Sequence, residues 1–219
     1  MSRENDRIST DVACIDTERL HAVLISDRGA HCKVFQTAGH RRRKSAPVRN
    51  FVVKMHLLGC SRRESEIYHR DYLKLKQQLA DIIPYAVFIR TRINGDPNLL
   101  VIAHAYTPWF NIANPANESE ALPLLGKYHK ACKQLQIFVI AAKEWRKKEG
   151  KLIDLYGVDN LVLDKNYQIR YLDSFEVFFY EDMLHIMDDA GPELKERIAI
   201  SAKRLEYLEY LLEQNRNNL

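Results

Sequence analysis

The stretch that decides the fold is residues 152–175, LIDLYGVDNLVLDKNYQIRYLDSF. Two short apolar runs, 161–163 and 168–172, flank the turn residues 164–167 and predict a tight β-hairpin. Asp154 precedes this hairpin, Asn160 stands immediately before its first strand, and Asp173 follows its second strand. Three polar groups are therefore gathered around one small hairpin.

These three residue types suit phosphoryl transfer from ATP. That reaction needs metal ligands and a carboxylate near the accepting hydroxyl, and Mg²⁺ prefers hard oxygen donors. We expect Asp154 to act as the base or orienting carboxylate, and Asn160 and Asp173 to ligate the metal. Each also has a structural alternative, because Asp and Asn at loop edges often form Asx turns or cap helices.

The first half of the chain predicts strands around one helix. Runs rich in β-branched and aromatic residues predict strands at 20–26, 32–37, 50–56, 85–93 and 99–106, the last two forming a hairpin around the turn 94–98. Ser61 and Glu64 form an S-x-x-E capping pattern, and the helical spacing that follows continues to Pro84.

Lys54 and Glu64 are the candidate ion pair of this half. Lys54 closes the third predicted strand, and Glu64 lies four residues before Tyr68, which places it on the inward face of the next helix. An anion there would hold the lysine toward nucleotide phosphates. The alternative is that Lys54 snorkels from a strand end and Glu64 only completes the capping box with Ser61.

The second half predicts mainly helices. Residues 97–117 contain prolines and asparagines that indicate a connection without regular structure. Apolar residues at spacings of three and four then predict one long helix from Ala121 to Arg146, and another helix begins near Pro192 and runs almost to the end. The fold class is therefore α+β.

With these elements in this order, the chain resembles the protein-kinase-like superfamily over residues 20–180, and most of all its small bacterial sugar and lipopolysaccharide-core kinases. The resemblance implies a two-lobed fold. Residues 1–106 would form a five-stranded N-lobe with one helix, and residues 107–219 a reduced, mainly helical C-lobe with the catalytic-loop hairpin at 152–175.

The resemblance also implies roles for the residues already singled out. Lys54 looks like the lysine of the third strand and Glu64 like its helix partner. Asp154 looks like the catalytic-loop aspartate, and Asn160 like the asparagine of that loop. Asp173 looks like the aspartate of the D-F-G motif.

The same resemblance implies ATP and Mg²⁺ as cofactors. Arg28 and Gly29 would lie in the loop that covers the phosphates, and His104 and Tyr106 in the hinge, residues 103–106, that holds adenine. The chain departs from the family pattern in five places. The phosphate loop has a single glycine, Asn160 follows Asp154 by six residues rather than five, Leu152-Ile153 replaces His-Arg, Ser174-Phe175 replaces Phe-Gly, and nothing resembling A-P-E follows.

Two functions follow as expectations. The first is an ATP- and Mg²⁺-dependent phosphotransferase acting on a hydroxyl of a sugar, a lipopolysaccharide-core-type glycolipid or another small acceptor. The short stretch after Asp173 argues against a folded protein substrate. The alternative is a catalytically weak or inactive pseudokinase that acts as a nucleotide- or partner-binding module, which the single-glycine loop and the missing His-Arg motivate.

The distribution of charged residues along the chain limits the kinds of partner that we expect. The net charge is +4, and residues 1–50 hold the whole excess, with 10 Lys/Arg and 6 Asp/Glu; residues 28–63 contain ten basic residues and no acidic one. Such a block fits an anionic glycan, a membrane surface or nucleotide phosphates, or is a solvated basic loop. No helix-turn-helix or RNP-like pattern accompanies it, so we expect no nucleic acid partner.

Composition and motifs exclude several classes. With 46% apolar and 28% charged residues the chain is globular, and no apolar run is long enough for a bilayer. The first fifteen residues lack a signal-type apolar core, so we expect a cytoplasmic protein, with peripheral contact at the inner membrane face as an option. The four cysteines form no C-x-x-C pattern, and the eight histidines have no paired metal spacing.

Overall fold

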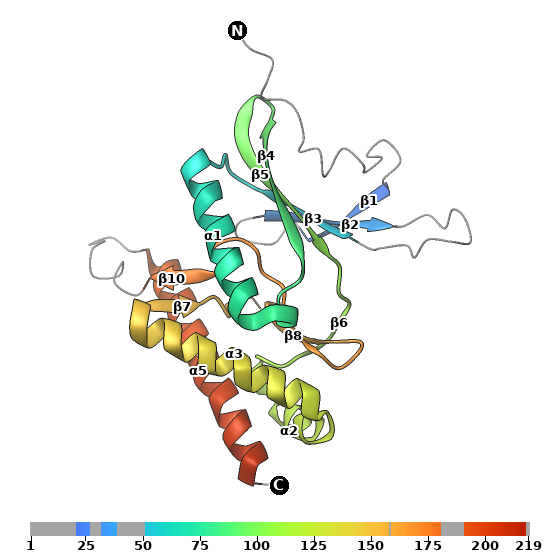
Figure 1. Cartoon of the computed structure of the whole chain (residues 1–219), viewed down its shortest axis with the longest axis vertical. Helices are drawn as coiled ribbons and strands as arrows, with labels where there is room; N and C mark the ends of the chain where they lie inside the picture. Colours follow the sequence, from blue (N-terminus) through green and yellow to red (C-terminus); the bar gives the residue numbers. More distant parts are fainter. Residues whose placement is uncertain (1–20, 27–31, 39–50, 158, 181–190, 218–219) are drawn as a thin grey trace. The chain divides into compact units, whose positions relative to one another are not determined.

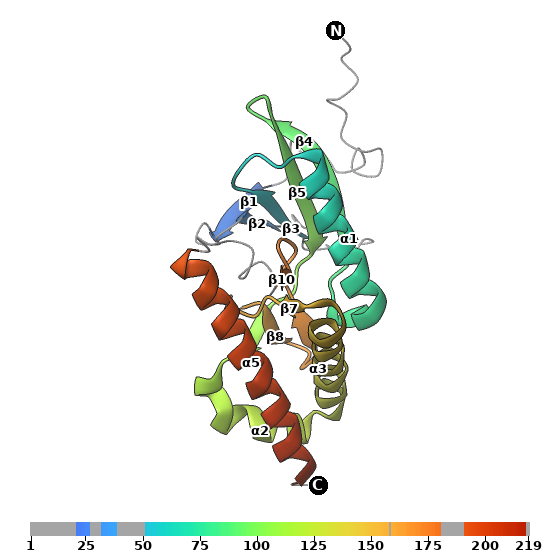
Figure 2. The same cartoon turned by 90° about the vertical axis from the view of Figure 1, so that its left-hand side faces the viewer.

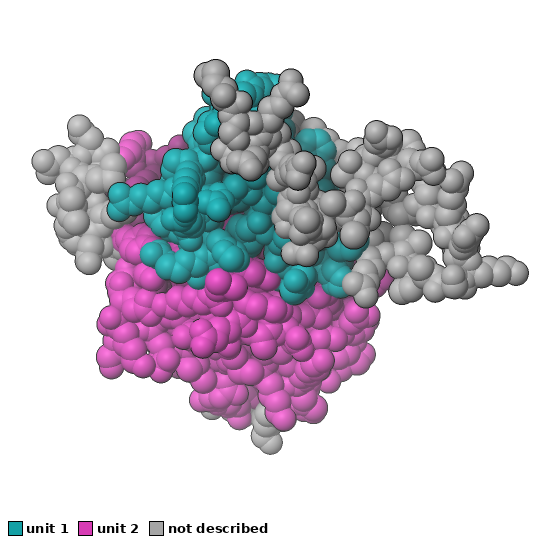
Figure 3. All heavy atoms as spheres, turned by 45° about the horizontal axis from the view of Figure 1, so that its top comes forward, with its two compact units in different colours: residues 1–70, 84–105 teal, residues 71–83, 106–219 magenta. Residues whose placement is uncertain are grey.

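The computed structural model describes residues 21–26, 32–38, 51–157, 159–180 and 191–217. These residues form a mixed α+β architecture that divides into two compact units (Figure 3). Unit 1 comprises residues 1–70 and 84–105, and unit 2 comprises residues 71–83 and 106–219.

Unit 1 is built on one antiparallel sheet of five strands in the order β1-β2-β3-β5-β4 (Figure 1). The strands are β1 (His21–Ser26), β2 (Cys32–Ala38), β3 (Phe51–His56), β4 (Ala86–Ile93) and β5 (Asp96–His104). All five strands predicted from the β-branched and aromatic runs are present. The predicted 85–93/99–106 hairpin is also present, with Ala86 opposite Ala103 and Ile93 opposite Asp96.

The turn of that hairpin is tighter than predicted. Only Asn94 and Gly95 form it, both with left-handed backbone angles (φ of 54° and 92°), as a two-residue type I′ turn requires. Pro97 is thus part of β5. Strand β3 pairs only with the 100–104 part of β5, so the proline takes no amide from the ladder on that side.

Helix α1 (Arg62–Leu79) begins with the predicted capping box. The Ser61 amide donates to a Glu64 carboxylate oxygen (2.7 Å), and the Glu64 amide donates to Ser61 Oγ (3.2 Å). The buried face carries Ser65, Tyr72, Leu75 and Leu79. Residues 62–70 of the helix belong to unit 1 and residues 71–79 to unit 2, whereas the predicted N-lobe included the whole helix.

Among its described residues, unit 2 combines two small sheets with three whole helices and the second half of α1 (Figures 1 and 2). One sheet has the order β6-β8-β9 and the other pairs β10 with β7. The strands are β6 (Pro108–Asn111), β7 (Lys151–Ile153), β8 (Leu161–Asp164), β9 (Ile169–Tyr171) and β10 (Phe178–Tyr180); the helices are α2 (Glu118–Lys127), α3 (His129–Glu149) and α5 (Pro192–Asn217). Two 3-10 turns, η2 (Ala80–Ile82) and η3 (Pro115–Asn117), complete the unit.

The β8–β9 hairpin and helix α5 confirm their predictions, but the single helix predicted from Ala121 to Arg146 is wrong. The chain breaks at Tyr128 (φ −106°, ψ 78°), which separates α2 from α3. There the Tyr128 ring stacks on Tyr167, with centroids 3.9 Å apart and planes 9° from parallel. The apolar spacing runs through the break without a change of phase, so it gave no sign of it.

The connection predicted to lack regular structure contains strand β6. This strand begins at Pro108 and lies at an edge of its sheet, where a missing amide donor is tolerated. Strands β7 and β10 were not predicted either. Each has only three residues, too few to show an alternating pattern.

None of the helices within the described residues combines the length and apolar character that crossing a bilayer requires.

Candidate functional site

The β8–β9 hairpin brings two of the predicted residues together. Asn160 directly precedes β8, and its carbonyl accepts a hydrogen bond from the amide of Leu172, which follows β9 (2.8 Å). Asp173 is therefore held opposite Asn160, and Asn160 Nδ2 lies 3.4 Å from Asp173 Oδ2. The proximity expected from the sequence is present.

Asp154 joins this pair through its backbone. It directly follows β7, and its amide donates to the carbonyl of Val177 beside β10 (2.9 Å). Its own carbonyl accepts two hydrogen bonds, from Asn160 Nδ2 (3.1 Å) and from the Tyr171 hydroxyl (2.9 Å). Strand β7 and the hairpin thus fix the relative positions of Asp154, Asn160 and Asp173 inside unit 2.

The Asp154 carboxylate is buried and fully engaged. The residue is 3% exposed; Oδ1 accepts from the Tyr156 amide (2.7 Å), and Oδ2 forms an ion pair with Arg197 Nη2 (3.3 Å). Burial, and after it the charge of Asp173, raises the pKa of Asp154 to about 6, against the opposing effects of the Tyr156 amide and Arg197. A carboxyl with this pKa can exchange a proton near neutral pH.

Tyr171 supports Asp154 from the core. Its side chain is completely buried, and burial, together with the charges of Asp173 and Asp154, raises its pKa well above the ordinary value. The phenol therefore keeps its proton and stays a donor to the Asp154 carbonyl.

Asp173 and Asn160 offer the hard oxygen atoms that Mg²⁺ prefers. Asp173 Oδ1 accepts from the amides of Ser174 (2.7 Å) and Phe175 (3.4 Å), which leaves Oδ2 directed at Asn160. Asn160 turns its amide nitrogen, not its oxygen, toward Asp173, so ligation by both would need a half turn of the Asn160 amide. Within the described residues, no group of three or more His, Cys, Asp or Glu side chains could hold a metal ion.

The position of the Asn160 side chain requires a glycine at residue 157. A Cβ atom at position 157 would lie 2.2 Å from Asn160 Oδ1 and 2.8 Å from its Cγ. Contacts that short do not occur between non-bonded atoms, so a side chain at 157 would force Asn160 away from Asp154 and Asp173. The glycine of the sequence D-L-Y-G-V-D-N therefore belongs to the site.

Helix α5 contributes residues that the sequence analysis missed. Arg197 reaches the Asp154 carboxylate, the fully buried Ser201 accepts from the Leu155 amide (3.1 Å), and Arg204 donates to the carbonyls of Leu155 and Tyr156 (both 2.6 Å). A signal for Ser201 was present. It lies three residues after Ile198 and four before Leu205, in the middle of an otherwise apolar stripe.

Lys54 and Glu64 lie in unit 1, and their predicted ion pair stays a prediction. Lys54 is in β3 between Val34 of β2 and Val101 of β5 and is 8% exposed. The inward position predicted for Glu64 is wrong, because Glu64 is exposed while Ser65 next to it is buried. The capping interaction with the Ser61 amide draws the Glu64 carboxylate back over the start of the helix.

The two described residues predicted to hold adenine stand on either side of the boundary between the units, and this role stays a prediction. His104 ends β5 in unit 1, where its amide donates to the Tyr85 carbonyl (3.0 Å). Tyr106 belongs to unit 2, where the Arg170 guanidinium lies 4.3 Å from the centre of its ring. Arg28 and Gly29 lie outside the described residues, so their role in covering phosphates stays a prediction.

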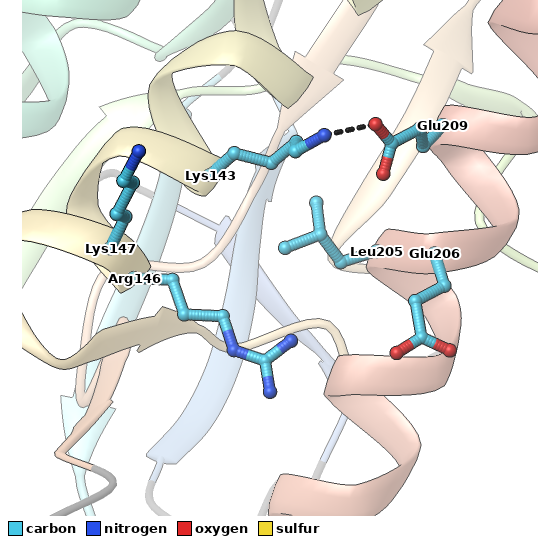
Figure 4. Close-up of a pocket in the computed structure, with 6 residues that line it drawn as sticks. All are labelled: Lys143, Arg146, Lys147, Leu205, Glu206 and Glu209. Carbon is cyan, nitrogen blue, oxygen red and sulfur yellow. Dashed lines mark hydrogen bonds and ion pairs between the residues drawn. The ribbon is translucent and has the colours of Figure 1, made fainter.

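A pocket between α3 and α5 is a different feature (Figure 4). Its walls carry basic side chains from α3 and acidic ones from α5, and Lys143 forms an ion pair with Glu209 across it. The lining residues are Lys143, Arg146, Lys147, Leu205, Glu206 and Glu209. None of them is a predicted site residue, and the pairing of opposite charges accounts for the pocket as part of the contact between two helices.

Comparisons with known proteins leave the family open. No family model and no curated protein matches the chain. Among solved structures, the chain is similar to an apo pseudokinase, at 8% sequence identity and a TM-score of 0.40, over 69% of this chain and 56% of that one. The chain thus spans little more than half the length of that protein. A likeness this low carries no argument, so a functional assignment has to rest on the site itself.

Proposed function

We propose that this protein is an ATP- and Mg²⁺-dependent phosphotransferase that acts on a hydroxyl group of a small acceptor such as a sugar or a glycolipid. One observation carries the proposal: Asn160 contacts both the Asp154 carbonyl (3.1 Å) and Asp173 (3.4 Å) at the base of one hairpin. A base and two metal-ligand candidates at this spacing are the parts that phosphoryl transfer requires of a protein.

In this proposal Asp154 takes the proton of the acceptor. The hydroxyl oxygen bonds to the γ-phosphorus of ATP, the bond from that phosphorus to the β–γ bridging oxygen breaks, ADP leaves, and the hydroxyl proton passes to Asp154. A carboxyl whose pKa is about 6 is mostly ionised at neutral pH and can accept that proton.

The remaining residues would bind and neutralise the nucleotide. Asp173 and Asn160 would hold Mg²⁺, which when bound neutralises charge on the phosphates. One feature bears on the acceptor: the acid-free block 28–63 suits an anionic glycan or a membrane surface.

A second candidate function has an observation of its own. Asp154 is 3% exposed, and both its carboxylate oxygens are occupied, by the Tyr156 amide and by Arg197. A base closed off in this way suits a module that binds nucleotide or a partner without turnover.

Nucleotide binding tests both candidates. We expect ATP with Mg²⁺ to raise the thermal midpoint of the whole chain, and ATP with EDTA to raise it less, because a ligand that binds only the folded state stabilises it. Asp173→Asn should remove the metal-dependent part of the shift. Asp96→Asn, an exposed change in the β4–β5 hairpin, is the matched control and should leave it intact.

Turnover separates the two candidates. Transfer of the γ-phosphate to members of a panel of sugars and lipopolysaccharide-core oligosaccharides, lost in Asp154→Asn, would establish the enzyme. Metal-dependent binding without transfer to any acceptor or to water would favour the module. A chain whose midpoint does not respond to nucleotide with Mg²⁺ or Mn²⁺ would contradict the enzyme and the nucleotide-binding form of the module, and would favour a module that binds a partner.

A further inference from the structure

Helix α5 fixes the backbone around Asp154 without help from Arg197. Ser201 accepts from the Leu155 amide, and Arg204 donates to the carbonyls of Leu155 and Tyr156. Arg197 lies four residues before Ser201, so all three residues share one face of the helix. The side chain of Arg197 could therefore move while Ser201 and Arg204 keep the Asp154 loop in place.

The guanidinium of Arg197 is buried, but few of its donors have a hydrogen-bond acceptor among the described residues. A guanidinium carries five N–H donors, and the side chain is only 9% exposed, yet the one hydrogen bond that it forms with the described residues is a 3.3 Å contact from Nη2 to Asp154. Its Nε is buried with no acceptor among the described residues. Native structures rarely leave a buried donor unpaired, and one that is unpaired calls for an explanation.

Charge balance for Asp154 alone does not explain this geometry. A guanidinium that only neutralises a carboxylate usually forms two short parallel bonds, of about 2.7–2.9 Å. Here the contact is single and long, and the guanidinium also lies over the rings of Phe179 (5.1 Å) and Tyr156 (5.8 Å). Tyr156 itself is at the surface, 36% exposed. An anion that reaches Tyr156 would thus be beside Arg197.

We propose that Arg197 is a phosphate-binding residue that leaves Asp154 to bind a phosphate group of a substrate. The planar guanidinium matches two phosphate oxygens, and Nε with one Nη would supply the paired donors. The move would free Asp154 Oδ2 for the acceptor hydroxyl, so phosphate binding would also make the base available. This inference rests on the proposed function for the identity of the reaction, and it makes Arg197 a further residue of the same site.

The phosphate has two sources, which share one chemistry: the terminal phosphate of the nucleotide, or a phosphate carried by the acceptor. In the first case Arg197→Met would abolish the preference for ATP over ADP. In the second case the variant would keep that preference, and inorganic phosphate would bind to the wild-type chain together with ATP.

Side-chain NMR tests the contact directly. The Nε–H signal of Arg197 in the full chain, assigned by its loss in Arg197→Lys, should shift when sodium phosphate or ATP is added, because Nε gains an acceptor. Potassium chloride at the same ionic strength should leave it unchanged. An Arg197 signal that responds to none of inorganic phosphate, ATP and ADP overturns the proposal.

Affinity measurements give the second readout. We expect Arg197→Met to weaken phosphate or ATP binding about tenfold to a hundredfold, the range expected for losing a charged hydrogen bond. Arg197→Lys should retain part of the affinity. Arg216→Met, an exposed arginine on the same helix, is the matched control and should bind as the wild type does. Equal affinities in wild type and Arg197→Met would refute the proposal.

Removing Arg197 alone leaves Asp154 without its ion-pair partner, so Arg197→Met is also made together with Asp154→Asn, which removes both charges.

The two proposals fail in different ways. If Arg197→Met binds nucleotide and transfers phosphate as the wild type does, the proposed function stands and this inference is overturned. If the Arg197 signal responds to phosphate but the chain binds no nucleotide, the anion site stands and the proposed function is overturned.

Discussion

At the scale of single residues, the site depends on what stands next to each polar group. Gly157 shows this clearly, because the Asn160 side chain occupies the space that a side chain at position 157 would need. A hydrogen atom at that position lets the Asn160 amide reach both the Asp154 carbonyl and Asp173. The asparagine is therefore positioned as much by this glycine as by its own hydrogen bonds.

Gly157→Ala should disturb the site more than the fold. The new methyl group would displace the Asn160 side chain, and we expect a loss of about 1–3 kcal/mol in the free energy of unfolding, typical of overpacking. Urea denaturation measures this loss. The metal-dependent part of any ATP-induced stabilisation should disappear at the same time.

Gly191→Ala is the control for that change. Its chain neighbours aside, no described atom lies within 4 Å of where its Cβ would be, and its place just before α5 adds only the modest cost of alanine at a helix N-cap. The free energy of unfolding should therefore stay within about 1 kcal/mol of wild type. Equal stabilities for Gly157→Ala and wild type would contradict the close approach of Asn160.

Asp154 predicts how stability depends on pH. Its pKa is raised from 3.8 to about 6 in the folded protein, so the folded state binds this proton more tightly than the unfolded state does. The stability it contributes is present below pH 4 and is lost as the pH rises through 6. We expect Asp154→Asn to gain stability over wild type as the pH rises from 5 to 8, by about 1.5 kcal/mol, because about half of the full effect of this pKa shift has already developed at pH 5.

Thermal midpoints of both proteins at several pH values measure this difference. Asp159→Asn removes an exposed carboxylate from the same loop and serves as the comparison for a general change of charge. An advantage of Asp154→Asn that stayed constant or shrank from pH 5 to pH 8 would show that burial does not dominate at Asp154.

At the scale of elements, α5 makes the site a shared product of two distant segments. Ser201 is completely buried and is the acceptor for the Leu155 amide, in the loop that carries Asp154. Ser201→Ala would leave that amide unpaired, which costs about 1–3 kcal/mol. Alanine favours a helix by up to about 0.5 kcal/mol, so we expect a smaller net loss of stability.

Hydrogen exchange reports on the same bond. The Leu155 amide should exchange faster in Ser201→Ala, while amides in the α3 core keep their protection. Lys203→Ala, an exposed change on the same helix, controls for the gain in helix propensity and should leave Leu155 protected. Unchanged protection of Leu155 in Ser201→Ala would mean that α5 does not hold this loop.

The elements also show how far the sequence could go. Strands β1 to β5, the β8–β9 hairpin and α5 were predictable because each has a strong local pattern or a clear end signal. The break at Tyr128 was not, because the apolar spacing continues through it and Tyr167, the ring on which Tyr128 stacks, comes from a distant turn. Strands β6 and β7 carry too little periodicity to be recognised by themselves, whereas β8 and β9, which are as short, were recognised from the turn residues 164–167 between them.

The site follows the same rule. Asn160 and Asp173 could be paired from the sequence because one hairpin joins them. Arg197 could not, because its contact with Asp154 depends on how α5 packs, which no local pattern encodes. The position of Glu64 was misjudged because the capping bond to Ser61, itself predictable, removes that side chain from the inward face.

At the scale of the whole molecule, the two units interleave along the chain. Residues 71–83 belong to unit 2 although residues 84–105 return to unit 1. Within unit 2, the Asp81 carbonyl accepts from Arg170, Lys74 pairs with Glu149, and η2 contacts β9. Unit 2 therefore cannot be obtained as one continuous piece of the chain.

The fragment 106–219 should fail to fold by itself. It lacks Leu75, Leu79, Ile82 and Ile83, each no more than 2% exposed in the whole chain. Burying side chains of this size stabilises by about 1.5–3 kcal/mol each, so their loss approaches the roughly 5–15 kcal/mol by which a domain is stable. The Arg170 guanidinium, buried beside Asp164, would lose its Asp81 acceptor as well. We expect no cooperative thermal transition from this fragment in circular dichroism.

Adding the missing segment supplies the control. A peptide of residues 62–83 should bind the fragment and restore a cooperative transition, and the same peptide with Leu75→Ala and Leu79→Ala should not, because it returns the backbone without the buried surface. A fragment 106–219 that melts cooperatively with no peptide present would show that the core of unit 2 is complete without α1. In that case unit 2 would begin at residue 106, and residues 71–83 would not be needed for it to fold.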